Sequence, residues 1–190
     1  MSNIWFTSDL HLGHESISDL RGFGSTATHD IELCDRWIDS VSRRDQVWVL
    51  GDIAISRHDL ALSLIEGLPG TKHLISGNHD PSHPMHRKSA TGQARMLEVF
   101  ASVQPFARRK VGGEDVLLSH FPYNGPGGDR GEIRHPQWRL PDLGEWLLHG
   151  HTHMEDQRRH GKQIHVGLDA WDLAPVQIET IAELMKEEIE

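Results

Sequence analysis

Short apolar runs that end abruptly in polar turns recur along this chain. The runs at 4–8 and 46–50 are mostly apolar and β-prone and predict β-strands, and a third strand is predicted at 72–76. Further strand candidates follow at 101–110 and 115–118, an apolar run occupies 145–148, and a last strand is expected at 163–167. The strands are therefore expected to be short and to deliver polar groups at their carboxyl ends.

Apolar residues at helical spacing separate these runs. Ile31, Cys34, Ile38 and Val41 predict a helix over 30–43. Further helices are predicted at 58–67, near 94–100, and from Pro175 to Glu190. Because strands, turns and helices alternate, we expect an α/β fold whose ligands bind beyond the carboxyl ends of the strands. At 190 residues the chain is long enough for one domain, 1–190, with a substantial core.

Five of the predicted turns carry side chains that bind metals. These turns are Asp9-Leu10-His11, Gly51-Asp52, Gly77-Asn78-His79-Asp80, Ser119-His120 and Gly150-His151-Thr152-His153. Together they supply enough oxygen and nitrogen ligands for two adjacent divalent cations, and two-metal sites most often hydrolyse phosphate esters. The alternative is that five separate strand ends carry such residues for packing or solubility alone.

Composition narrows the class of partner. The chain has 19 Lys and Arg against 28 Asp and Glu, a net charge of -9, which disfavours a protein that coats nucleic acid, so no stable nucleic-acid partner is expected. Two bound divalent cations would reverse that sign locally, so a small phosphorylated substrate fits the composition. The 15 histidines suit a transition-metal protein.

Nothing in the sequence suggests a membrane or an oxidising compartment. No apolar segment approaches the roughly 18 residues that span a bilayer, and the N-terminal residues lack a basic leader region. The single cysteine, Cys34, is expected to be a small buried hydrophobe. We therefore expect a cytoplasmic protein with no membrane association.

The ordered blocks resemble those of the calcineurin-like metallophosphoesterases: D-x-H, G-D-x-x-D, G-N-H-D/E, a histidine after a strand, and G-H-x-H. The resemblance covers most of the chain. It implies a four-layer α/β/β/α sandwich of two mixed β-sheets flanked by helices. It also implies that Asp9, His11 and His153 hold one ion, that Asn78, His120 and His151 hold the other, and that Asp52 bridges them. Mixed imidazole, carboxylate and amide ligands suit Mn²⁺, the expected metal, or Fe, Zn²⁺ or Ni²⁺.

The resemblance makes His79 the catalytic side chain, which assists the departing oxygen as a general acid. The family block G-D-x-x-D ends in an acid that in many members orients this histidine, whereas Ile55 stands at the matching position here. Water or Asp80 would then be the partner of His79, or the ring would act unaided. A weaker contribution from His79 is expected than in members with the acid.

Several other residues are candidates for binding substrate or for supporting ligands. Candidate substrate contacts are His14, Tyr123, Arg134 and Arg139, each with a plainer alternative as a solvated or packed side chain. Asp169 ends a strand on the expected site edge and is a candidate to orient a ligand histidine. The Gly-rich segment 124–141 is long enough to be a binding loop or lid.

The sequence favours a metal-dependent phosphodiesterase that acts on a small molecule, with a cyclic nucleotide as the leading candidate. A phosphomonoesterase or a nucleotide pyrophosphohydrolase would use the same metals in a differently walled pocket. A metal-binding scaffold with little activity is the alternative of another class, and a nuclease is less favoured because no basic track leads to the metals.

Overall fold

Two five-stranded sheets stand at the centre of the computed structural model, which describes residues 2–123, 133–155 and 159–187. The first sheet has the order β10-β1-β2-β3-β4, with β1 to β4 parallel and β10 antiparallel to β1. Its strands are β1 (Ile4–Thr7), β2 (Gln46–Val49), β3 (Thr71–Ile75), β4 (Ser102–Gln104) and β10 (Val176–Gln177). The parallel strands therefore end at one edge.

The second sheet has the order β5-β6-β7-β9-β8 and is also mixed. Its central strands β6, β7 and β9 are parallel, and the outer strands β5 and β8 are antiparallel to their neighbours. The strands are β5 (Phe106–Val111), β6 (Glu114–Ser119), β7 (Trp146–His149), β8 (Arg159–His160) and β9 (Gln163–His165).

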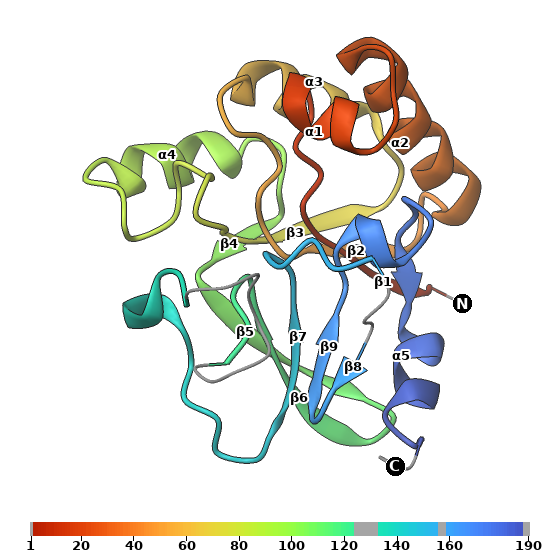
Figure 1. Ribbon diagram of the computed structural model, residues 1–190, viewed down its shortest axis with the longest axis vertical. Helices are drawn as coiled ribbons and strands as arrows, with labels where there is room; N and C mark the ends of the chain where they lie inside the picture. The colour runs from red at the N-terminus through yellow and green to blue at the C-terminus, as the bar shows by residue number, and fades with distance from the viewer. Residues whose placement is uncertain (1, 124–132, 156–158, 188–190) are drawn as a thin grey trace.

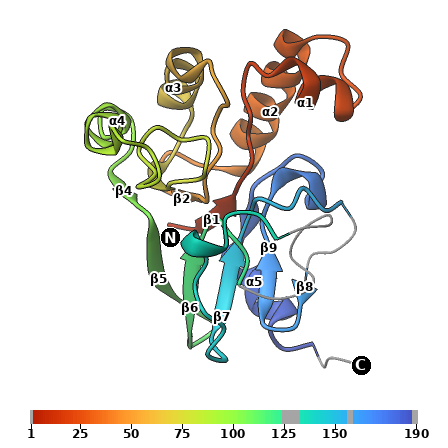
Figure 2. The same ribbon diagram turned by 60° about the vertical axis from the view of Figure 1, so that its left-hand side comes forward.

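Four helices lie on one face of the first sheet, and the second sheet lies across the other face (Figure 1 and Figure 2). These helices are α1 (Glu15–Leu20), α2 (Thr26–Ser40), α3 (His58–Gly67) and α4 (Ser89–Met96). A fifth helix, α5 (Ile178–Leu184), packs against β1, β5 and β10. The expected α/β fold with two mixed sheets flanked by helices is confirmed.

Alternation along the strands builds a separate core on each face of the first sheet. In β2, Val47 and Val49 pack under the helices, whereas Trp48 and the following Leu50 pack between the sheets. Because successive side chains of a strand point to opposite faces, four consecutive apolar residues fill two cores. Asp45 fixes the start of this strand by accepting hydrogen bonds from the backbone of Asn3 and Ser42 and from the Trp5 indole.

The structure corrects several predicted boundaries. The expected strand 101–110 is two strands, because Pro105 interrupts it and the chain passes there from the first sheet to the second. The helix predicted from Pro175 begins only at Ile178, since Val176 pairs with β1 as an edge strand. The helix expected near 94–100 lies at Ser89–Met96 instead.

Two further differences involve helix starts. Helix α1 has no predicted counterpart, and the helix predicted over 30–43 begins at Thr26. In each case a polar side chain caps the helix: His14 Nδ1 accepts from the Ile17 N–H, and Ser25 Oγ accepts from the Thr28 N–H.

The structure shows the surroundings of Cys34 and the character of the described helices. Cys34 is half-buried and packs against the core under the helices. Within the described part of the chain, no helix combines the length and apolar character needed to cross a bilayer.

Candidate metal centre

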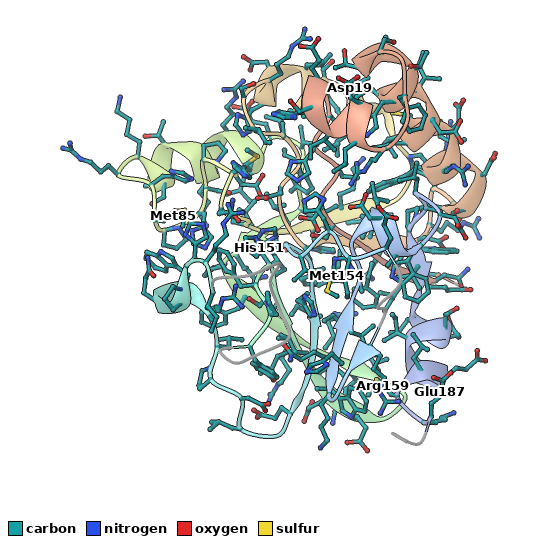
Figure 3. The ribbon with its side chains drawn as sticks, in the orientation of Figure 1. Asp19, Met85, His151, Met154, Arg159 and Glu187 are labelled. Carbon is teal, nitrogen blue, oxygen red and sulfur yellow. The ribbon has the colours of Figure 1, made fainter. Side chains whose placement is uncertain are left out.

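The five turns that carry candidate metal ligands lie together where strands of both sheets end. The Asp9 N–H donates to the Gly51 carbonyl and the His11 N–H to the Asp52 carbonyl, each at 3.0 Å. A parallel bridge between Ser8 and Gly167 joins the end of β1 to the segment after β9. Figure 3 shows the labelled His151 at the junction between the two sheets. Turns far apart in sequence are thus neighbours at one place.

The backbone at these turns adopts the left-handed conformation that L-residues other than glycine seldom adopt. Eight non-glycine residues in the described chain have positive φ, and five of them are metal-ligand candidates, with φ between 47° and 71°. They are Asp9, His11, Asp52, His151 and His153. Strained backbone of this kind persists where the surrounding structure fixes it, and it concentrates at functional sites.

Two glycines allow the turns to approach one another. Gly51 has φ 92°, and a Cβ there would lie 2.5 Å from the Gly77 nitrogen and 2.6 Å from His120 Nδ1. A Cβ on Gly77 would overlap the Asp52 carboxylate. The glycine of each block is therefore required by close packing of the turns.

The first group of candidate ligands consists of Asp9, His11 and His153. The Nε2 atoms of His11 and His153 are 3.0 Å apart, and Asp9 Oδ1 lies 3.7 Å from His153 Nε2 and 4.0 Å from His11 Nε2. Burial lowers the pKa of His11 to about 3, even though the nearby carboxylates of Asp52 and Asp9 act to raise it. A neutral imidazole has the lone pair that a metal requires.

The second group consists of Asp52, His120 and His151, with Asn78 beside them. His120 Nε2 lies 3.4 Å from Asp52 Oδ2 and 3.1 Å from Asn78 Oδ1. Its Nδ1 donates to the Leu50 carbonyl at 2.7 Å, which directs Nε2 toward the cluster. The same Asp52 Oδ2 lies 4.0 Å from His11 Nε2, so this carboxylate faces both groups, as a bridging ligand must.

His120 and Asp52 each shift the pKa of the other toward its charged form. Burial acts to lower the pKa of His120, but the adjacent Asp52 carboxylate outweighs it and raises the pKa to about 9. Burial acts in the opposite direction on Asp52, whose pKa is nevertheless held well below its usual range by His120, His11 and His79. A divalent cation bound here would take the place of the His120 proton as the partner of Asp52.

A buried ion pair supports the first group from behind. Asp169 Oδ2 accepts from His153 Nδ1 at 2.9 Å, and the Arg21 guanidinium donates to both Asp169 oxygens at 2.8 and 3.0 Å. Arg21 also donates to the Asp9 and Leu10 carbonyls. Carboxylates that orient ligand histidines in this way fix the ring and raise its basicity. Asp169 lies beside a ligand histidine, as the sequence predicts. Nothing in the sequence marks Arg21, whose partner is 148 positions away.

Asp80 supports the second group by a route that differs from the one expected. Its carboxylate accepts hydrogen bonds from the backbone N–H groups of Asp52, Ile53 and Gly77 at 2.7–3.1 Å, so it holds the turns together. Two more histidines brace the same loop, since the rings of His86 and His58 donate to the Asn78 and His79 carbonyls. Of the alternatives for His79, water or an unaided ring fits these contacts better than Asp80 does.

A cavity of about 290 Å³ opens beside both groups. Besides candidate ligands it is lined by His79, Arg134, Thr152, Ile17, Leu20 and Ile55. The His79 side chain is 34% exposed, and its Nε2 lies 3.9 Å from Asp52 Oδ2. Burial lowers the pKa of His79, against the opposing effect of Asp52.

Three of the four expected substrate contacts have other roles. Tyr123 is 2% exposed, and its hydroxyl donates to the Glu145 carbonyl. Arg139 is buried and donates to the Arg134 and Tyr123 carbonyls, and His14 caps α1. Arg134 alone lines the cavity, and the expected loop 124–141 lies outside the described residues up to position 132.

The donor set fits a pair of divalent cations. The structure brings together all seven side chains that the resemblance assigns to the metals. Two groups, Asp9–His11–His153 and Asp52–His120–His151, each place three ligand atoms within 4.8 Å of one another. Imidazoles together with carboxylates suit first-row transition ions.

Known proteins share this chain's pattern over most of its length. The model of the calcineurin-like phosphoesterase superfamily domain matches residues 3–168. The gene 66 protein of Mycobacterium phage L5 is 44% identical over 185 residues, 90% of this chain and 88% of that protein. The gene 66 protein of Mycobacterium phage D29 is 44% identical over 188 residues, 93% of each chain.

A solved structure agrees in fold. The crystal structure of a protein of unknown function from Aquifex aeolicus superimposes with a TM-score of 0.74, at 24% identity, over 97% of this chain and 100% of that one. Because the family match includes all five ligand turns and every strand that carries them, it agrees with the geometry of the site. The chain belongs to the calcineurin-like phosphoesterase superfamily.

Proposed function

We propose that this chain is a two-metal phosphodiesterase for a small phosphorylated molecule, with a nucleotide as the leading candidate. Asp9, His11 and His153 would hold one cation, and Asn78, His120 and His151 the other. Asp52 would contact both. The observation that carries this proposal is the convergence of the two donor groups on Asp52.

A bound pair of divalent cations supplies charge neutralisation at the phosphoryl oxygens and an activated water. The chain's own groups then position the ester. Arg134, at the cavity wall, is placed to donate to a phosphoryl oxygen. His79 is the one ring beside Asp52 that remains a third exposed, and it is suited to protonate the departing oxygen.

The lining of the cavity favours a diester over a monoester. Arg134 is the only cationic Lys or Arg side chain among the described lining residues. A diester carries one negative charge, whereas a monoester dianion concentrates nearly two and needs more donors around it. Two organic groups flanking phosphorus also match a cavity that is partly aliphatic.

The test is a substrate panel with Mn²⁺ supplied to metal-free protein. Bis-(4-nitrophenyl) phosphate, 4-nitrophenyl phosphate, 2′,3′- and 3′,5′-cyclic nucleotides and a dinucleoside polyphosphate would be compared. We expect metal-dependent hydrolysis with the diesters fastest, abolished by a chelator. Preference for the mono-ester or the polyphosphate would assign the chain to the alternative esterase classes.

Asp52→Asn is the matched inactive variant, because asparagine tolerates the left-handed backbone found there, with φ 56°. Asp172→Asn is its control, since Asp172 is exposed and has φ 51°. Only the first substitution should abolish turnover. A protein that binds Mn²⁺ and hydrolyses none of the esters would instead be the metal-binding scaffold.

A further inference from the structure

One wall of the cavity beside the metal centre is aliphatic. Ile17 and Leu20 come from α1, and Ile55 comes from the segment after β2. Residues three apart share one face of a helix, so Ile17 and Leu20 present a continuous surface. We call Ile17, Leu20 and Ile55 the aliphatic wall.

The fold makes no use of this wall. None of its three members belongs to either hydrophobic core of the described residues, and Leu20 remains 63% exposed. Helix α1 is held instead by polar contacts: Ser18, its one buried residue, donates to the Ser25 carbonyl at 2.8 Å. Figure 3 shows α1, on which Asp19 is labelled, on the opposite side of the junction from the second sheet.

The neighbours of the wall are strongly polar. The same cavity contains the rings of His11, His79, His151 and His153 and the carboxylate of Asp52. A ligand that fills it therefore meets charge at one side and hydrocarbon at the other. Water makes no hydrogen bonds with the aliphatic side chains. An apolar group that packs against them removes hydrocarbon surface from water, which is favourable in free energy.

The sequence at position 55 adds to this asymmetry. Where the family block ends in an acid, this chain has a half-buried isoleucine that faces the cavity. The change removes a negative charge and adds apolar surface beside the ligands.

We infer that the substrate is a phosphodiester with one aromatic or nucleobase-sized ester group that packs against the aliphatic wall. This inference rests on the proposed function. The cavity volume of about 290 Å³ lies near the small end of ligand pockets, which suits one such group beside the phosphate.

The test uses a series of diesters that share the 4-nitrophenolate leaving group and differ in the second ester group: methyl, butyl, phenyl and naphthyl. Because the leaving group is constant and intrinsic reactivity is the same for wild type and variants, the part of the kcat/KM dependence that the wall variants lose reports how the second group is held. We expect kcat/KM of the Mn²⁺-loaded wild type to rise at least tenfold from methyl to phenyl, since even one methylene group held in a hydrophobic pocket contributes a factor of about ten or more.

Leu20→Asn and Ile55→Ser should flatten this dependence to less than about threefold. Two variants on different segments guard against one failing to fold. Leu97→Asn is the control, because Leu97 is 49% exposed and follows α4, outside the cavity lining. Its series should match the wild type.

The outcomes separate the two proposals. Turnover of the whole series with equal kcat/KM would overturn the aromatic subsite alone, whereas no metal-dependent turnover of any ester would overturn the proposed function. Light scattering provides a further check: a dimer that Leu20→Asn converts to a monomer would make the wall an interface between copies and overturn the subsite.

Discussion

Asp169→Asn tests whether the buried ion pair behind His153 controls metal affinity. The substitution keeps the shape of the side chain and removes its charge. Asp169 is 9% exposed and Arg21 is 4% exposed, and the three contacts that join His153, Asp169 and Arg21 are 2.8–3.0 Å long. Burial acts to raise the pKa of Asp169, but His153 and Arg21 hold it well below its usual range, so the carboxylate is ionised.

Two magnitudes follow from this geometry. Removing one partner of a buried ion pair costs about 3–5 kcal/mol, and the retained amide oxygen reduces the loss, so we expect about 2–3 kcal/mol of lost stability. Outer partners of metal ligands change metal affinity by about 10–100-fold. The loss should fall on the cation held by His153, because Asp169 accepts from the ring of that histidine.

Isothermal titration of metal-free protein with Mn²⁺ measures this directly. The variant should show one affinity reduced about 10–100-fold and the other unchanged, and Asp172→Asn should match the wild type. A variant that binds both ions as tightly as the wild type would refute the reasoning. If the affinities for both ions fell equally and the melting temperature fell as well, the role of Asp169 would be purely structural.

Three further predictions concern single side chains. His79→Ala should reduce the hydrolysis of alkyl esters by about 10²-fold and that of 4-nitrophenyl esters by less than tenfold, because nitrophenolate leaves without a proton. Steady-state kinetics measure both losses, and equal losses would exclude the acid role of His79. Asp80→Ala should lower the free energy of unfolding by about 4 kcal/mol, because three buried N–H groups lose their acceptor; a loss below 1 kcal/mol in urea denaturation would contradict this. Asp45→Asn should destabilise by about 2 kcal/mol at pH 7. Burial acts to raise the pKa of Asp45, but N–H groups of Asn3, Ser42 and Trp5 lower it from 3.8 to about 2. As the pH falls, Asp45 therefore takes up a proton in the unfolded chain before it does so in the folded chain. The difference in free energy of unfolding between variant and wild type should have its full value above pH 4 and should disappear as the pH falls to about 2. A difference independent of pH, followed by thermal denaturation, would show that the charge of Asp45 is unimportant.

Strand geometry explains why turns far apart in the sequence could be expected to meet. Asp9, Asp52 and Asn78 each follow a short apolar run, and parallel strands bring the residues after them to one edge. His120 and His151 follow strands of the other sheet, and the structure places them against the first three. Local pattern and position after a strand single out the turns, whereas the division of their side chains between two metals is what the resemblance to the family implies.

The parts that the sequence does not predict depend on distant contacts. Arg21 looks like an ordinary helix residue until Asp169 is brought beside it from 148 positions away. The start of α5 is set by the pairing of Val176 with β1, which outweighs the helical spacing around it. Tyr123 resembled a substrate contact because it follows His120, yet its ring is packed and its hydroxyl is already bonded.

Anomalous diffraction from crystals soaked in Mn²⁺ tests the central claim most directly. Two manganese peaks should appear, one among Asp9, His11 and His153 and the other among Asn78, His120 and His151, with Asp52 contacting both. Crystals of Asp52→Asn should lose at least one of them. Crystals of the wild type that take up no manganese at these side chains, at concentrations that saturate the activity, would contradict the account.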